Sequence, residues 1–364
     1  MFIFFAPMTT DSALLVDVRD HIAHVTLNRP AALNALTHDM IRSLATHLRA
    51  WEQDANVRAI VVRGAGEKAF CAGGDIRALY EAGKRGESDM SFFIDEYRLN
   101  YEIHTYFART SKPYVAWIDG IVMGGGMGIS QGASIRIVGD RTKMAMPETL
   151  IGMFPDVGGT YFLSRAPGAI GLYLGLTGQT IKAADALYAG LATHYVATAR
   201  AAEFDAALAA NSTIHAALEA FATSPAEPAT LPLLRALIDK HFADKADVPA
   251  ILASLASETT AQEWAAETIK TLNKRSPTML AVSHRAITRG RSICLADCFR
   301  IEIELTRATF AHGDVLEGIR ALVIDKDHAP KWKPATLAEV SPARVEDFFT
   351  QKWQPHPLAD IERC

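Results

Sequence analysis

Two acidic residues, Glu148 and Asp156, stand in an otherwise apolar stretch that ends in glycines. The stretch is MPETLIGMFPDVGG, residues 146–159, and each acid directly follows a proline. An acid on a solvated surface needs no such setting, whereas apolar walls and neighbouring charges are what shift the pKa of an acid. The stretch therefore predicts two acids held for chemistry, either proton transfer or nucleophilic attack.

Both acids also have a structural explanation. Glu148 could lie in the first turn of a helix, where the helix dipole favours a negative charge. Asp156 could be a turn or capping residue before the sequence VGG. The stretch by itself leaves the catalytic and the structural explanations open.

Two glycine-rich segments, FCAGGD (70–75) and MGGGMG (123–128), each follow an extended segment and precede a helical one. Because glycine has no Cβ, a ligand can lie against the backbone there. Peptide N–H groups at such a point can stabilise a developing negative charge, which would make an oxyanion hole. Close packing of a helix on a sheet explains the same glycines equally well.

The elements that must position these residues alternate between strands and helices over the first 150 residues, which indicates the α/β class. Strands are predicted over 14–18 and 22–27, and a helix is predicted after Thr37, a suitable capping residue. After about residue 165 the strand signal fades. Residues 180–223 are alanine-rich and read as helix, 224–232 read as a loop, and helical patterns then continue to about residue 323.

The composition excludes several classes of protein. The chain has 364 residues, 49% of them hydrophobic, and a formal net charge of −4 without a basic run, so no nucleic-acid partner is predicted. No stretch reaches the roughly 18 consecutive apolar residues of a membrane span. The four cysteines form no CxxC pair, and His312 and Asp314 lack a third ligand nearby, so no metal site is predicted.

Four segments in order resemble the crotonase, or enoyl-CoA hydratase/isomerase, superfamily: NRPAALNAL (28–36), KAFCAGGDI (68–76), PYVAWIDGIVMGGGMGIS (113–130) and MPETLIGMFPDVGGTYFLSR (146–165). Within that superfamily, FFIDEYRLNY and the C-terminal HGDVLEGIRALVIDKDHAPKWKPATLAEV are similar to the 3-hydroxyisobutyryl-CoA hydrolase branch. The resemblance covers nearly the whole chain.

The resemblance implies an α/β fold with a crotonase-like spiral of ββα units and a long helical C-terminal region. The chain then divides into an N-terminal tail (1–11), an acyl-CoA-binding spiral core (12–210) and a helical C-terminal region with an arm (211–364). Relatives of this type are often trimers or hexamers, so a homo-oligomer is compatible with the resemblance. The N-terminal apolar run lacks preceding basic residues and is shorter than a usual signal core of about 7–15 residues, so a cytoplasmic location is expected.

Site residues carry over from the family residue by residue. The backbone N–H groups of Gly74 and Gly125 fall on the oxyanion-hole donors, Glu148 on the family's glutamate, and Asp156 on the aspartate of the hydrolase branch. Expected substrate contacts are Glu96, Arg29, Leu33, Phe70, Cys71, Ala72, Gly73 and Lys326. In this set the backbone of Phe70–Gly73 is expected to contact CoA, the Cys71 side chain is expected to be packed, and Lys326 has a solvated arm as an equal alternative.

The resemblance implies hydrolysis of a short branched 3-hydroxyacyl-CoA thioester, such as the 3-hydroxyisobutyryl-CoA of valine breakdown. Coenzyme A is then part of the substrate, and no separate cofactor is expected. Hydratases carry a second glutamate at the position of Gly128, where the side chain would point towards the thioester, so this position is expected to be an empty place and hydration is disfavoured. An isomerase and a CoA-binding protein without turnover stay open, as does the choice between Glu148 as nucleophile and as general base.

Overall fold

The computed structural model describes residues 12–85, 90–210, 213–350 and 353–362. The tail predicted for residues 1–11 lies outside this described part. Within it, no helix is long and apolar enough to cross a membrane.

The larger of two sheets has six strands, and only its first pair is antiparallel. In spatial order the strands are β1 (Leu14–Arg19), β2 (Ile22–Leu27), β3 (Ala59–Gly64), β5 (Tyr114–Ile118), β7 (Ile135–Val138) and β9 (His194–Tyr195). Parallel strands are buried on both faces in most proteins, and the run AIVVRG of β3 is apolar on both sides for this reason.

A second, parallel sheet contains three short strands, which are β4 (Ala69–Cys71), β6 (Ile121–Met123) and β8 (Lys143–Ala145). Each follows one strand of the larger sheet along the chain and precedes a helix: α2 (Ile76–Lys84), α4 (Gly125–Gln131) and the 3-10 helix η2 (Glu148–Ile151). This threefold repeat of strand, strand and helix confirms the ββα spiral expected from the sequence.

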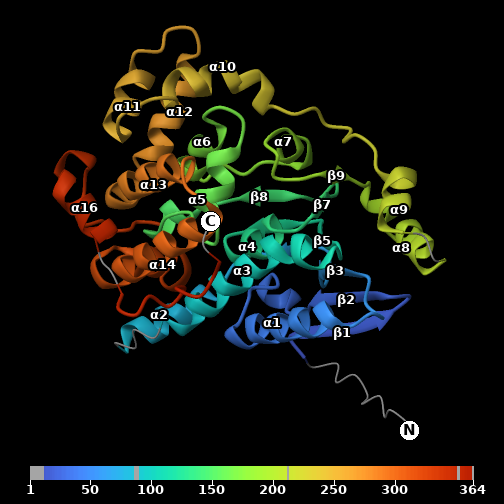
Figure 1. Cartoon of the computed structure of the whole chain (residues 1–364). Coiled ribbons are helices and arrows are strands. Elements are labelled where there is room, and N and C mark those ends of the chain that lie inside the picture. The colour runs from blue at the N-terminus through green and yellow to red at the C-terminus, as the bar shows by residue number, and fades with distance from the viewer. Residues whose placement is uncertain (1–11, 86–89, 211–212, 351–352, 363–364) are drawn as a thin grey trace.

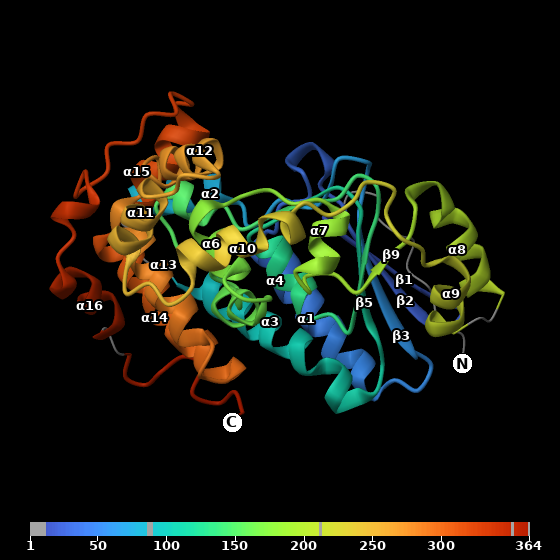
Figure 2. The same ribbon diagram turned by 90° about the horizontal axis from the view of Figure 1, so that it is seen from above.

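Helices cover both faces of the large sheet. Helices α1 (His38–Gln53), α3 (Ser91–Thr110) and α4 lie on one face, and α8 (Ala201–Ala209) and α9 (Ile214–Phe221) lie on the other (Figure 2). The predicted capping residue Thr37 accepts a hydrogen bond from the Met40 N–H at 3.2 Å, as expected. The division of the chain at residue 210 stays a prediction. Helices α8 and α9, which lie on either side of that point, pack together on the sheet.

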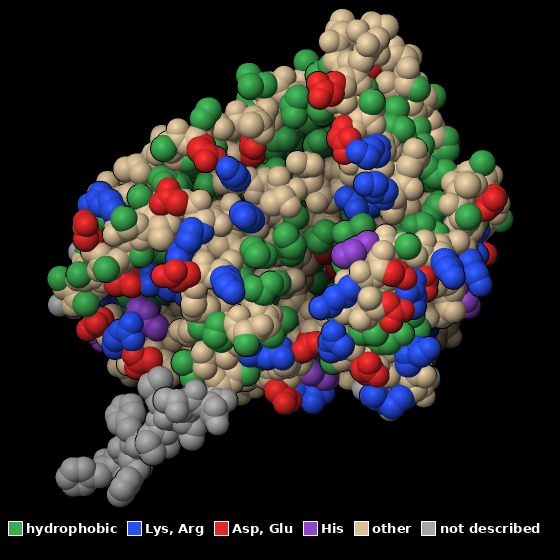
Figure 3. Space-filling model, turned by 180° about the vertical axis from the view of Figure 1, so that it is seen from behind, with side chains coloured by type: hydrophobic (Ala, Val, Ile, Leu, Met, Phe, Trp, Pro, Cys, Tyr) green, Lys and Arg blue, Asp and Glu red, His purple; other side chains and the backbone are tan. Residues whose placement is uncertain are grey.

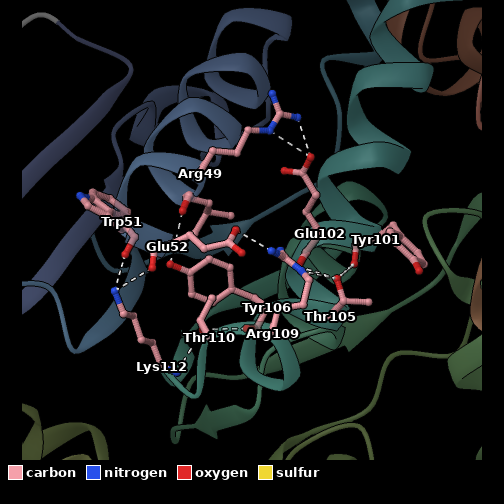
Figure 4. Close-up of polar contacts among 11 residues, drawn as sticks. Arg49, Trp51, Glu52, Tyr101, Glu102, Thr105, Tyr106, Arg109, Thr110 and Lys112 are labelled. Atoms are coloured by element: carbon pink, nitrogen blue, oxygen red, sulfur yellow. Dashed lines mark hydrogen bonds and ion pairs between the residues drawn. The ribbon is translucent and has the colours of Figure 1, made fainter. Parts of the chain in front are cut away.

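Helix α3 is anchored to α1 by polar contacts at its C-terminal half (Figure 4). Arg49 pairs with Glu102, and Arg109 pairs with Glu52. The Lys112 ammonium beyond the end of α3 donates to the backbone carbonyls of Trp51, at 2.5 Å, and of residues nearby. These contacts fix a helix whose N-terminal half faces the site described below.

Long helices make up the C-terminal region, on the side of the molecule opposite α8 and α9 (Figure 1). They are α10 (Leu231–Phe242), α11 (Val248–Ala256), α12 (Gln262–Leu272), α13 (Pro277–Gly290), α14 (Leu295–His312), α15 (Val315–Ile319) and α16 (Pro342–Thr350). They pack on α3 and on three helices that follow the spiral, which are α5 (Gly159–Phe162), α6 (Ile170–Thr177) and α7 (Ala183–Tyr188). The predicted loop before α10 is present, whereas β9 was missed, because two residues are too few to show a strand pattern.

Candidate active site

A cavity of about 450 Å³ opens where the glycine-rich segments, η2 and α3 meet. Its lining includes Glu96 from α3, Gly125 at the start of α4, and Glu148 and Asp156 from the stretch that follows β8. The C-terminal region closes another side through Leu322 and its neighbour in a π-helix that spans Arg320–Ile324. Residues far apart in sequence therefore meet around one largely apolar space.

The two glycine segments bring backbone N–H groups together at the cavity wall. Around Gly74, the Leu36 N–H donates to the Gly73 carbonyl and the Asp75 N–H donates to the Leu36 carbonyl. In a parallel bridge of this kind the N–H of Gly74 itself points to the other side, towards α4. A Cβ on Gly125 would lie 3.2 Å from that nitrogen. Gly125 begins α4, so its own N–H has no acceptor within the helix.

Two buried carboxyl groups press against the triple glycine. A Cβ on Gly124 would lie 3.1 Å from Glu148 Oε1, and a Cβ on Gly125 would lie 2.5 Å from Glu96 Oε1. The φ angle of Gly124 is +48°, in the region that favours glycine. Gly124 and Gly125 are thus needed for two reasons. The two acids approach them closely, and α4 begins at this point.

Glu148 and Glu96 each have one buried carboxyl oxygen, Oε2 and Oε1 respectively, with no hydrogen-bond partner among the described residues. Burial, followed by repulsion from Asp156, raises the pKa of both groups well above the usual value for a glutamate. Unpaired buried oxygens and raised pKa values are typical of groups held for a ligand or for proton transfer.

Asp156 differs from these two glutamates because a hydroxyl side chain donates to it. The Tyr97 hydroxyl donates to Asp156 Oδ2 at 2.6 Å. Burial raises the pKa of Asp156 to about 6, and the bond from Tyr97 opposes that rise. Burial thus raises the pKa of all three carboxyl groups, and for Asp156 a tyrosine hydroxyl counteracts the rise.

Gly128 does not leave an empty place at the cavity, which corrects the expectation from the sequence. A Cβ there would lie 2.6 Å from Asn100 Nδ2 and 2.7 Å from Val157 Cβ. The glycine lets α4 pack against α3 and the turn after Asp156. A glutamate could not enter this position without moving those neighbours.

The structure brings most of the predicted site residues to this cavity, but not all. Leu33, Ala72 and Gly73 line it together with the acids and the two glycines already described. Phe70 and Cys71 are fully buried in the core, and burial raises the pKa of the Cys71 thiol to about 12, so neither side chain faces the cavity.

Two basic residues of the predicted set also lie outside the lining. Arg29 is turned to Asp75, at 3.0 Å, and to the Ala35 carbonyl. Lys326 is exposed on the C-terminal arm and has a φ of +56°. A CoA contact by either residue stays a prediction.

Sequence reasoning missed several residues at the site. Tyr97, Phe92, Phe93, Leu322 and Val323 all belong to motifs that carry the resemblance, but no role at the site was predicted for any of them, and the last four line the cavity. In the sequence, the adjacent Phe92 and Phe93 weakly indicate an apolar wall. Nothing in the sequence indicates that Leu322 and Val323 lie at the cavity. The Arg77 guanidinium donates to the Val323 carbonyl at 3.1 Å and so ties α2 to the π-helix across the cavity.

No group of three or more His, Cys, Asp or Glu side chains suited to a metal ion occurs in the described part of the chain. Asp314, considered with His312 in the sequence, accepts the Lys333 N–H at 3.1 Å and so holds the C-terminal arm.

Comparison with known proteins identifies the family to which the chain belongs. The model of the family described as enoyl-CoA hydratase/isomerase matches residues 22–349. A 3-hydroxyisobutyryl-CoA hydrolase of Danio rerio is 42% identical, over 90% of this chain and 86% of that protein. The small ribosomal subunit protein mS47 of Neurospora crassa is 39% identical, over 90% of this chain and 70% of its own length.

A solved relative extends the match to three dimensions. The crystal structure of a carnitinyl-CoA dehydratase from Mycobacterium thermoresistibile superposes with a TM-score of 0.89 at 42% identity, covering 97% of this chain and all of the other (100%). The cytoplasmic location expected from the sequence is contradicted, because the Danio rerio hydrolase is named mitochondrial. That expectation was based on the first residues alone. Residues there without a recognisable targeting signal do not indicate the compartment. The matched family model and these relatives show that the chain belongs to the enoyl-CoA hydratase/isomerase, or crotonase, family.

Proposed function

We propose that the protein hydrolyses the thioester of a short, branched 3-hydroxyacyl-CoA, with the 3-hydroxyisobutyryl-CoA of valine breakdown as its substrate. The observation that carries the proposal is the meeting of two backbone amides with an unpartnered Glu148 oxygen in one cavity. The similarity to 3-hydroxyisobutyryl-CoA hydrolases supports the choice of acyl group.

The amides of Gly74 and Gly125 would receive the thioester oxygen. Attack on the carbonyl carbon places negative charge on this oxygen, and two aimed N–H donors stabilise it, each by about 3 kcal/mol. The donors are part of the backbone of two rigid segments, so they need no rearrangement when the charge develops.

Glu148 supplies the group that starts the reaction, in one of two ways. Its carboxylate attacks the carbonyl, coenzyme A leaves as the thiol, and water opens the resulting anhydride. Alternatively the carboxylate removes a proton from water, which attacks directly. Both routes consume one water, release the acid and the thiol, and require Glu148 in its ionised form.

Glu96 and Asp156 are suited to hold the hydroxyl of the acyl group, because both carboxyl groups line the same cavity. One face of the molecule is hollowed near its middle, and Lys and Arg side chains stand around the hollow (Figure 3). Basic surroundings of this kind suit the phosphates of a CoA ester.

A lyase is the second candidate, because the solved relative with 42% identity is described as a dehydratase and because Glu96 and Asp156 share the cavity with Glu148. Hydration needs one acid on each side of the alkene. Gly128 supplies none, so one of these two residues would have to take that role.

The test compares thiol release from 3-hydroxyisobutyryl-CoA with hydration of crotonyl-CoA by one enzyme preparation. We expect hydrolysis to dominate, and Glu148→Gln to reduce it at least about a hundredfold with substrate binding retained. Glu219→Gln is the matched control, since it makes the same change at an exposed position of α9, outside the cavity. Faster hydration than hydrolysis would establish the lyase, and binding of CoA esters without either reaction would indicate a non-enzymatic protein.

A further inference from the structure

Helix α14 contacts the turn that carries Asp156, although it lies more than 140 residues further along the chain. Glu302 is completely buried there. Its Oε2 accepts the Gly158 N–H at 2.7 Å, and its Oε1 accepts the Thr160 N–H at 2.9 Å and the Thr160 hydroxyl. Both carboxyl oxygens therefore hold the backbone that directly follows Asp156.

A second set of contacts runs from the same face of α14 to the Asp156 side chain. Thr306, one helical turn after Glu302, has its Oγ1 2.6 Å from the Tyr97 hydroxyl oxygen. The single Tyr97 hydroxyl proton is donated to Asp156 Oδ2. The Thr306 hydroxyl must therefore donate to Tyr97, and donors arranged in series polarise and strengthen one another.

We propose that Glu302 and Thr306 are positioning residues for Asp156. Glu302 fixes the backbone of the turn, and Thr306 orients Tyr97 so that its proton goes to Asp156. This inference rests on the function proposed above. Neither residue lines the cavity, so both act through Asp156 and Tyr97, and the C-terminal region becomes part of the catalytic apparatus rather than a scaffold around it.

The alternative is a purely structural role, in which Glu302 satisfies free N–H groups and Thr306 fills space. The two roles differ in what happens to the Asp156 carboxyl. Loss of the Thr306 hydroxyl should weaken the bond from Tyr97, which holds the pKa of Asp156 down, so that pKa should rise. A space-filling role leaves it unchanged.

Removing the Thr306 hydroxyl leaves the other titratable groups around Asp156 unchanged. Glu96 faces it from α3, Glu148 from η2 and Glu302 from α14. His104 of α3 lies near the same turn, where a Cβ on Gly158 would be 3.5 Å from its Nε2. Burial lowers the pKa of His104 to about 3, so this residue stays neutral over the pH range in which Asp156 titrates.

The experiment uses the full-length protein with Thr306→Val, Thr306→Ser and Glu302→Gln. The matched control is Thr309→Val, a buried threonine on the same helix whose hydroxyl donates to the Met279 sulfur and to no other acceptor in the described part of the chain. The ionisation of Asp156 is followed by infrared difference titration against Asp156→Asn in each background. The kcat and KM for thioester hydrolysis are measured across the same pH range, and folding is checked by thermal unfolding.

We expect Thr306→Val to raise the titration midpoint of Asp156 and to lower kcat about tenfold, with KM changed by less than about twofold. Thr306→Ser should restore both values, and Thr309→Val should match the wild type. Glu302→Gln should lower kcat at unchanged KM in a folded protein. An Asp156 titration and turnover in Thr306→Val equal to those of the control would overturn the inference.

The titration separates this inference from the proposed function. If the wild type shows no thioester hydrolysis, the proposed function fails, and the midpoint shift in Thr306→Val still decides whether Thr306 acts on Asp156. If hydrolysis is present and the midpoint does not move, the positioning role alone is wrong.

Discussion

At the scale of single residues, three carboxyl groups in one cavity are distinguished only by their neighbours. Asp156 has the Tyr97 donor, whereas Glu96 and Glu148 each keep an unpaired buried oxygen. Leaving such an atom unpaired costs about 1–3 kcal/mol, which a protein tolerates where a substrate will supply the partner. This difference separates Asp156 from the two glutamates, and the choice of Glu148 as the reacting group rests on its correspondence to the glutamate of the crotonase family.

The pH dependence of hydrolysis should reveal the interaction between Glu148 and Asp156. Because burial, and after it the charge of Asp156, raises the pKa of Glu148, kcat/KM should rise with pH well above the usual range of a glutamate. Asp156→Asn removes that charge, so the pKa of Glu148 falls and the rising limb should move to lower pH, with a lower plateau. A limb that stays in place, measured by steady-state rates from pH 5 to 9 (about the range in which tuned carboxyl groups titrate), would contradict the coupling.

A single methyl group at Gly125 should abolish activity. A Cβ there would meet Glu96 Oε1 at 2.5 Å and the Gly74 nitrogen at 3.2 Å, so it enters the space between the acid and the proposed oxyanion donors. We expect Gly125→Ala to lower kcat at least about a hundredfold, comparable to the loss of an oxyanion donor. Circular dichroism and thermal unfolding would show that the variant folds, and normal turnover by a folded variant would remove this loop from the site.

At the scale of elements, the site depends on how closely α4 packs against α3. Gly128 permits this approach, with Asn100 of α3 and Val157 at the distances of close contact. Val157 directly follows Asp156, so the packing of two helices sets the place of a site residue. The position that would hold a second glutamate in a hydratase is used here for packing.

Gly128→Ala should therefore disturb both stability and activity. The added Cβ must displace Asn100 or Val157, which costs about 1–3 kcal/mol for overpacking in a tight core. We expect a lower Tm and a reduced kcat from displacement of Asp156. Wild-type values of both would show that the contact is softer than the structure indicates.

At the scale of the whole molecule, burying the acidic residues of the site lowers the free energy of unfolding when these residues are ionised. The spiral core, α3 and the C-terminal helices bury Glu96, Glu148 and Glu302, and burial raises the pKa of each. A group whose pKa is raised by folding contributes its full stability below the unfolded value, and this contribution is lost as the pH rises through the folded value. Neutral replacements of Glu96 or Glu148, each of which has an oxygen without a partner among the described residues, should therefore stabilise the protein at higher pH.

Glu148→Gln should have a higher Tm than the wild type, although it is inactive. At pH 4 (near the ordinary glutamate pKa of about 4.3) the two proteins should unfold at similar temperatures, and the difference should grow as the pH rises. Thermal unfolding at a series of pH values checks this. A lower Tm for Glu148→Gln at high pH would mean that ionised Glu148 has a stabilising partner in the folded protein. Glu219→Gln, at an exposed position of α9, is again the control.

Much of the fold and part of the site could be predicted from the sequence, because the signals are local. The cap at Thr37, the first two strands and the glycine segments each occupy a few consecutive residues. Glu148 and Asp156 stand in one such stretch, and their prolines and glycines were visible as backbone constraints. The resemblance then supplied Glu96 and the two glycine amides.

Tertiary structure alone decided how these pieces act on one another. Glu302 meets Gly158 across 144 positions and Thr306 meets Tyr97 across 209, and contacts at such separations leave no periodicity or spacing in the sequence. Phe70 and Cys71 belong to a motif that borders the cavity, but strand β4 is buried on all sides and turns both side chains into the core. Residue types and their local order thus determined which chemistry was available, whereas burial and long-range hydrogen bonds determined which carboxyl group receives a tyrosine hydroxyl and which oxygen is left for the substrate.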